Sequence, residues 1–190
     1  MNIARVLYPV RVLGPGDRLG IWVCGCHRAC PGCSNPELWN EKTEYEITID
    51  RLMQLIYTVN KTNNIDGFTI TGGEPMDQAD DLSILVDRLS EISEDILVYS
   101  GYCRDELFNR DPETQHVLET IAVLIDGEYI EEKNNDSRLR GSSNQKIHIL
   151  NSKFAAKYQQ YLDEGQNQIQ NFTISNGIVS VGIHRKGFTP

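Results

Sequence analysis

Hydrophobic residues follow two different spacings along the chain, and the change from one to the other predicts strands separated by helices. One helix is expected after Thr48, which can cap it, because apolar side chains then recur every three or four positions. Short continuous apolar runs predict buried strands. We expect strands within residues 2–13 and at 19–23, 68–71, 96–99 and 121–125, and helices at about 48–59, 82–92, 104–118 and 153–162.

Apolar strands that alternate with helices predict an α/β fold, with a parallel sheet covered on both faces. Right-handed crossovers would curl such a sheet into a complete or partial barrel, and 190 residues are too few for eight strand–helix units. Residues 131–145 are polar and predict a loop. The alternating segments 168–174 and 178–184 flank Ser175-Asn176-Gly177, and an Asn-Gly pair in that position predicts a β-hairpin.

The length of the chain suits a single domain, residues 1–190, with one hydrophobic core. No apolar run approaches the roughly 20 residues of a membrane span, and the first residues do not read as a signal peptide. We therefore expect a cytoplasmic location and no membrane partner. The net charge of -9 argues against a nucleic-acid partner, because phosphate binding needs clustered Lys and Arg, but it leaves a basic protein partner open.

Four of the five cysteines fall within residues 24–33. Clustered cysteines indicate metal or redox ligands, whereas a disulfide framework would spread them along the chain. Cys26, Cys30 and Cys33 have x3 and x2 spacing in one tight loop. Three thiolates at this spacing can bind three corners of a 4Fe–4S cluster and leave the fourth iron open for chemistry.

A zinc site is the alternative interpretation of the cysteine loop, with Cys24 as the fourth ligand. Thiolates bind zinc as well as iron. The spacing Cys24-Gly25-Cys26 is unusual for zinc, whose sites more often present paired CxxC elements far apart in sequence. From the cysteines alone both sites remain open.

A second motif, Thr71-Gly72-Gly73-Glu74-Pro75, follows the expected strand 68–71. Glycines let the backbone approach a ligand closely, and parallel sheets bind ligands at the carboxyl ends of their strands. The alternative is a tight strand-to-helix turn without a ligand.

Together these two motifs resemble those of the radical S-adenosylmethionine enzymes. The resemblance implies a partial (β/α)6-type barrel with extra N-terminal strands and a C-terminal β-hairpin. It also implies a 4Fe–4S cluster on Cys26, Cys30 and Cys33, with S-adenosylmethionine chelating the fourth iron and its amino group near Thr71, Gly72, Gly73 and Glu74. The implied reaction is an oxidoreductase step that cleaves S-adenosylmethionine to a 5′-deoxyadenosyl radical. Gly32 departs from the many family members with an aromatic residue before the third cysteine.

Three further segments resemble the activating proteins of anaerobic ribonucleotide reductases: Tyr99-Ser100-Gly101-Tyr102, residues 126–130 and residues 139–145. This resemblance covers about residues 17–150 and leaves 151–190 as an extension. It implies an anaerobic enzyme whose partners are a glycyl-radical enzyme and an electron donor such as flavodoxin or ferredoxin. Ser100 would contact the ribose or methionine part of the cofactor, and Asn144 and Gln145 would lie near it. Asp126 would be either a ligand at the rim of the sheet or a helix cap.

Two other functions stay open: a radical enzyme that modifies a peptide or small molecule, and a non-catalytic iron–sulfur or zinc protein. No histidine has a paired carboxylate at informative spacing, so no general acid–base site is expected. His184 is expected at the surface or at the end of the hairpin. Cys24 and Cys103 are expected to be small packed side chains and not cluster ligands.

Overall fold

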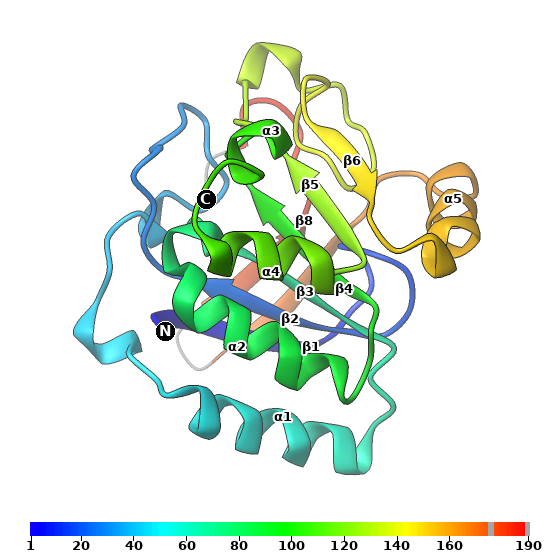
Figure 1. The fold of residues 1–190 in the computed structure, drawn as a ribbon. Helices are drawn as coiled ribbons and strands as arrows, with labels where there is room; N and C mark the ends of the chain where they lie inside the picture. The colour runs from blue at the N-terminus through cyan, green and yellow to red at the C-terminus, as the bar shows by residue number, and fades with distance from the viewer. Residues whose placement is uncertain (175–176, 189–190) are drawn as a thin grey trace.

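One sheet contains six strands: β1 (Ile3–Val10), β2 (Arg18–Val23), β3 (Gly67–Gly72), β4 (Ile96–Ser100), β5 (Val123–Asp126) and β6 (Lys146–Ile149). The computed structural model, which describes residues 1–174 and 177–188, orders them β1-β2-β3-β4-β5-β6 (Figure 1). Strands β2 to β5 are parallel, and β1 and β6 are antiparallel edge strands. The two edges do not pair with each other, so within the described residues the sheet is open and forms no closed barrel.

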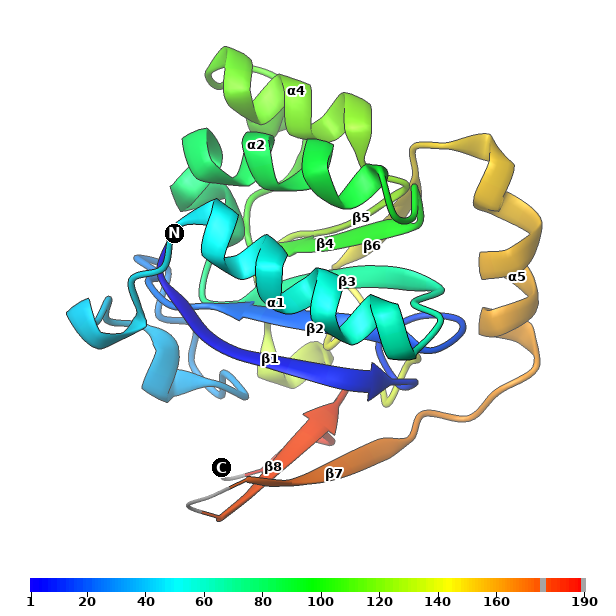
Figure 2. The same ribbon diagram turned by 90° about the horizontal axis from the view of Figure 1, so that it is seen from below.

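The helices that connect the parallel strands lie on one face of this sheet. They are α1 (Ile49–Thr62), α2 (Ala79–Ser90), α3 (Arg104–Leu107) and α4 (Pro112–Thr120). Each crossover from β2 to β5 moves one strand further in the same direction, and right-handed crossovers then place every connection on the same side. Figure 2 shows α1, α2 and α4 on that side, with a hairpin of β7 (Ile169–Ile174) and β8 (Gly177–Gly182) across the other. The second face is therefore covered by the hairpin, by loops and by α5 (Ala155–Asp163), whose Tyr158 packs with Leu97.

Alternate residues of the strands face the two layers. On β4, Ile96 and Val98 pack into the core under the helices, whereas Leu97 packs on the opposite face. On β2, Leu19, Ile21 and Val23 face the helices, while Trp22 belongs to the cluster that includes Val181 of the hairpin. The continuous apolar runs of the sequence thus correspond to strands buried on both faces.

Two elements differ from the expected ones. The helix expected at 104–118 is two helices, because Asp111 caps a new one: its Oδ1 accepts a hydrogen bond from Thr114 N at 2.7 Å, and Pro112 follows at the first helical position. Strand β6 was not expected, although Ile147 and Ile149 alternate with polar residues along it. The helix expected at 153–162 is α5 (Ala155–Asp163).

The other expected elements are confirmed with small shifts of their ends. Thr48 caps α1, since its Oγ1 accepts from Arg51 N at 3.2 Å. The hairpin strands are present, but Ser175 and Asn176 of the expected turn lie outside the described residues. Across the described part of the chain, every helix is too short or too polar to span a membrane.

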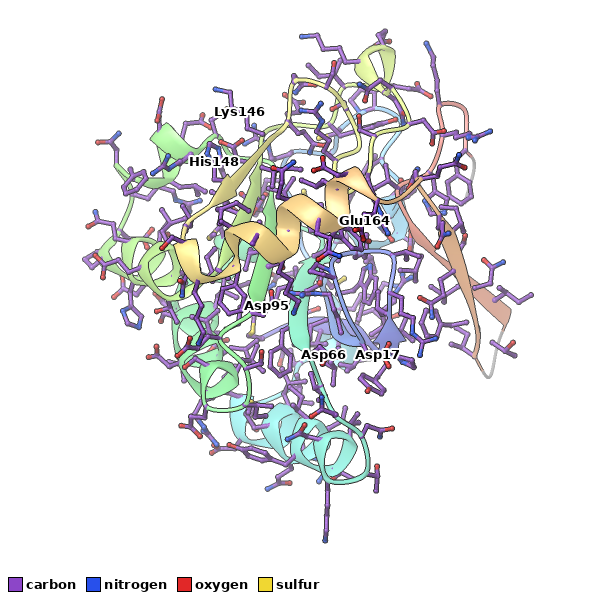
Figure 3. The ribbon with its side chains drawn as sticks, turned by 90° about the vertical axis from the view of Figure 1, so that its right-hand side faces the viewer. Asp17, Asp66, Asp95, Lys146, His148 and Glu164 are labelled. Carbon is purple, nitrogen blue, oxygen red and sulfur yellow. The ribbon has the colours of Figure 1, made fainter. Side chains whose placement is uncertain are left out.

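A buried ion pair joins the amino ends of the parallel strands. The Arg18 guanidinium lies 3.0 Å from Asp95 Oδ1, and both side chains are at most 1% exposed. Arg18 also donates to Thr69 Oγ1 at 2.7 Å. From α5, Tyr158 donates to Asp95 Oδ1 and Lys157 Nζ pairs with Asp95 Oδ2, each at 2.6 Å (Figure 3). Strands β2 and β3, helix α5 and the residue before β4 thus share one hydrogen-bonded charge cluster, as buried charges require.

Removing the Asp95 carboxylate is expected to destabilise the fold strongly. In Asp95→Ala the buried Arg18 loses its charged partner, and breaking a buried pair in this way lowers the free energy of unfolding by about 3–5 kcal/mol. The matched control is Glu94→Ala, because its pair with Lys153 is solvent-exposed and such pairs contribute about 0–1 kcal/mol. Urea denaturation measures both variants. Equal losses in the two would contradict the role of Asp95.

Candidate functional site

A cavity of about 180 Å³ lies where the parallel strands end. The loop after β2 contributes Cys26, Cys30 and Cys33 to its lining, and the β3 end contributes Thr71 to Glu74. Ser100 lines it from the end of β4. We refer to it as the cysteine cavity. The cysteine loop and the glycine motif therefore lie together at the carboxyl ends of the strands and line the same cavity.

The three thiols of the cysteine cavity are free and partly buried. Burial raises the pKa of the Cys26 and Cys30 thiols. Backbone N–H groups oppose this effect, from Arg28 and Ala29 at Cys26 and from Tyr129 at Cys30. The Cys33 sulfur accepts from Asn35 N at 3.4 Å. N–H groups directed at thiolate sulfurs are a general feature of protein iron–sulfur sites and tune their potentials.

The donor set fits a cluster better than a single ion. No group of three or more Cys, His, Asp or Glu side chains within residues 1–174 and 177–188 is placed to hold one metal ion. Cys24, the fourth ligand of the zinc alternative, is fully buried, and its thiol donates to Asn40 O at 2.9 Å. Neither Cys24 nor Cys103 lines the cavity. Cys24 is packed as expected, whereas the expectation of a packed side chain is wrong for Cys103, which is exposed. Three thiols that line one cavity without forming a single-ion site among the described residues suit a cluster of several metal atoms.

The paired glycines connect the second motif to the cysteine loop. Gly73 N donates to Val23 O at 2.8 Å, and Glu74 N donates to Gly25 O at 2.7 Å. A Cβ on Gly73 would lie 2.2 Å from Gly25 O, which no side chain can tolerate. The close approach that glycine permits here is thus between two backbone segments, while Gly72 and Gly73 also line the cavity. Sequence reasoning expected an approach to a ligand and missed the contact with the cysteine loop.

Glu74 is the buried charged residue of the site, 1% exposed. Desolvation raises its pKa from 4.5 to about 7, although Gly101 N, Met76 N and Ser100 Oγ donate hydrogen bonds that act against the shift. These three donors fix the carboxyl group between the ends of β3 and β4. Ser100, expected to contact the cofactor, lines the cavity and also donates to Glu74 at 2.9 Å.

Asp126 and Asn144 do not line the cysteine cavity. Asp126 Oδ2 accepts a hydrogen bond from the backbone N of Arg104 at 2.6 Å. Arg104 is the first residue of α3, so this contact favours the helix-cap interpretation of Asp126. Asn144 donates to Glu128 O at 2.8 Å. Gln145 does line the cavity, and its side chain closes its own loop by accepting from Gly141 N at 2.8 Å.

Three histidines have carboxylate partners in the structure, each from a distant part of the chain. His148 Nε2 lies 3.0 Å from Asp126 Oδ2, with both side chains largely buried, and Figure 3 shows His148 on β6. His27 lies 3.2 Å from Asp77 and His116 lies 2.8 Å from Asp87. Each partner is at least 22 positions away in sequence, so spacing could not reveal it.

Sequence reasoning also missed several residues of the cavity wall. They are aromatic or basic side chains to which sequence reasoning assigned no role in a site, namely Trp22, Arg28, Trp39, Tyr99, Tyr129 and His184. Arg28 is additionally stacked on Tyr102, with its guanidinium carbon 4.6 Å from the ring centroid. Along β2, successive side chains point to opposite faces of the sheet, which turns Trp22 away from the helices. This alternation was the one sequence signal that could have placed a residue in the cavity wall.

The sequence model of a 4Fe-4S single cluster domain matches residues 12–148. The anaerobic ribonucleoside-triphosphate reductase-activating protein of Escherichia coli K12 is 35% identical over 150 residues, which cover 75% of this chain and 96% of that protein. The protein of the same name from Haemophilus influenzae is 36% identical, with 74% and 94% covered, and that of phage T4 is 32% identical, with 77% and 93% covered. The chain belongs to the family of the 4Fe-4S single cluster domain, and it is similar to these activating proteins over nearly their whole length.

The pH dependence of stability tests the Glu74 environment. Because its pKa is raised, the folded protein binds this proton more tightly than the unfolded chain does. The contribution of Glu74 to the free energy of unfolding should therefore fall by about 3 kcal/mol as the pH rises from 4.5 to about 7, and then stay constant. Urea denaturation across this range measures it.

Glu74→Gln should flatten this dependence, because the amide does not titrate. Glu119→Gln removes an exposed carboxyl on α4 and should retain the wild-type slope. A Glu74→Gln protein with an unchanged slope would contradict the raised pKa.

Proposed function

We propose that this chain binds a 4Fe–4S cluster through Cys26, Cys30 and Cys33 and uses it to cleave S-adenosylmethionine, in order to activate a glycyl-radical enzyme such as anaerobic ribonucleotide reductase. The observation that carries the proposal is that the five cysteines fall into two groups in the structure. The three with the family spacing, and neither of the other two, line one cavity together with the Gly72-Gly73-Glu74 motif.

When bound, the cluster and S-adenosylmethionine would supply an electron and a 5′-deoxyadenosyl radical for hydrogen abstraction. The chain's own residues would bind the cluster, orient S-adenosylmethionine and shield both from water. Cys26, Cys30 and Cys33 would hold three irons of the cluster as thiolates, and the fourth iron would be left for the amino acid end of S-adenosylmethionine. Thr71 and the glycine pair offer backbone groups beside the thiols, and Glu74 offers a carboxyl fixed by three hydrogen bonds. Aromatic side chains exclude water from the rest of the cavity.

The open sheet supports the choice of a protein substrate. We interpret its four parallel strands, wound in one direction, as part of a (β/α)6-type barrel whose open side leaves room for a partner's glycine loop. The names of the similar proteins also favour activation of the anaerobic reductase. An electron donor such as flavodoxin or ferredoxin completes the proposal. An exposed cluster needs a reduced environment, and we propose the anaerobic cytoplasm.

Release of 5′-deoxyadenosine tests the chemistry. Protein reconstituted anaerobically with iron and sulfide should form it from S-adenosylmethionine and dithionite. Cys30→Ala should give no detectable product, because the cluster loses one of three ligands. Cys103→Ala, which changes an exposed cysteine outside the cavity, should match the wild type. Full iron loading of the wild type without product would exclude the proposed reaction.

Electron paramagnetic resonance tests the partner. The reduced wild-type protein with S-adenosylmethionine should generate a glycyl-radical signal on an anaerobic ribonucleotide reductase, and Cys30→Ala should not. If 5′-deoxyadenosine forms but no reductase radical appears, the substrate is a different peptide or a small molecule.

A further inference from the structure

The C-terminal segment forms one side of the cysteine cavity. Five consecutive residues, 180–184, line it together with the three thiols. They belong to the end of β8 and the turn after it, on the sheet face opposite the helices (Figure 2). The match to the 4Fe-4S single cluster domain ends at residue 148. This wall is therefore supplied by a part of the chain that the family match does not include.

Specific contacts hold this wall in place. Gln170 of β7 donates to Pro9 O at 2.7 Å, at the end of β1. Val181 is 2% exposed and packs in the same cluster as Trp22. Beyond the hairpin, Asn134 donates to His184 O at 2.9 Å. The segment is thus tied to β1, to the sheet face and to the loop after β5.

His184 is oriented from two sides. Its Nε2 lies 3.0 Å from Ser180 Oγ, and its ring stacks on Phe188 with centroids 3.7 Å apart and planes 17° apart. Burial lowers the pKa of the ring, which favours the neutral form with one donor and one acceptor nitrogen. Nδ1 is buried and has no hydrogen-bond partner in the part of the chain that the structure describes.

Two other residues of the cavity wall also have a buried side-chain nitrogen without a hydrogen-bond partner. Trp39 Nε1 and Arg28 Nε are also buried without a partner among the described residues. A buried polar atom without a partner is unfavourable by about 1–3 kcal/mol, so native proteins rarely keep one unless something binds there. Of the eight such side-chain atoms among the described residues, three belong to the wall of this cavity, and a ligand with several polar groups would satisfy them.

The remaining wall indicates what kind of ligand this is. Four aromatic side chains, Trp22, Trp39, Tyr99 and Tyr129, line the cavity, among polar residues that include His184 and Ser100. Aromatic walls with a few placed polar groups suit a flat heterocycle that carries hydroxyl groups. The nucleoside half of S-adenosylmethionine has this chemistry, whereas its methionine half is charged and flexible.

We propose that His184 is a binding residue for S-adenosylmethionine, and that its Nδ1 forms a hydrogen bond with the adenosine half of that molecule. The inference rests on the proposed function and adds to it a residue from the C-terminal extension. The extension then contributes directly to cofactor affinity.

Affinity measured by equilibrium dialysis tests this role. With anaerobically reconstituted protein, His184→Leu should bind S-adenosylmethionine about three- to tenfold more weakly, the effect of losing one hydrogen bond. His184→Gln should recover part of the affinity, because its amide can donate and accept. His116→Leu, an exposed histidine on α4 outside the cavity, is the matched control and should bind like the wild type. Iron content and thermal unfolding should be the same in all four proteins.

The probes 5′-deoxyadenosine and methionine separate the two halves of the ligand. His184→Leu should weaken binding of the first and leave the second unchanged. Wild-type affinity in His184→Leu, an effect on methionine alone, or loss of iron together with affinity would each overturn the inference. Failure of the wild type to bind S-adenosylmethionine would instead overturn the proposed function.

Discussion

The direction of the crossovers between the parallel strands determines on which face of the sheet the helices, the hairpin and the cavity lie. From β2 to β5 each crossover advances by one strand in the same direction, and right-handed connections therefore stack all their helices on one face. The same winding brings the carboxyl ends of four strands to one edge. The opposite face keeps no helix from these crossovers, and this is the space that the β7–β8 hairpin and the cysteine cavity occupy.

Within that frame, the site depends on a backbone contact between two loops. The hydrogen bonds from Gly73 to Val23 and from Glu74 to Gly25 fix the glycine motif against the start of the cysteine loop. Because no Cβ fits between Gly73 and Gly25, the two motifs can pack this closely only with glycine at position 73. Glu74 extends this unit to β4 through Ser100 and Gly101. Preorganised groups of this kind do not need to rearrange when a charged ligand arrives.

Much of this arrangement could be predicted from local patterns. Apolar runs located β2 to β5, and the spacing of Cys26, Cys30 and Cys33 identified the three thiols that line the cavity. What could not be predicted depends on pairing between distant segments. Strand β6 exists because β5 offers it a free edge, and the link of His148 to Asp126 follows from that pairing. The break between α3 and α4 could have been predicted, because Asp111-Pro112 is a sequence signal for the start of a helix.

One end of β2 contributes to the stability of the fold, and the other end leads into the candidate site. Its first residue, Arg18, enters the charge cluster with Asp95 at the amino ends of the strands, and its last leads into the cysteine loop. Every residue between them is buried. Helix α5 contributes Tyr158 and Lys157 to the amino-end cluster, while the hairpin after it contributes His184 to the cavity. The C-terminal extension therefore touches both ends of the sheet, which explains how a segment beyond the family match can be an integral part of the fold and of its cavity.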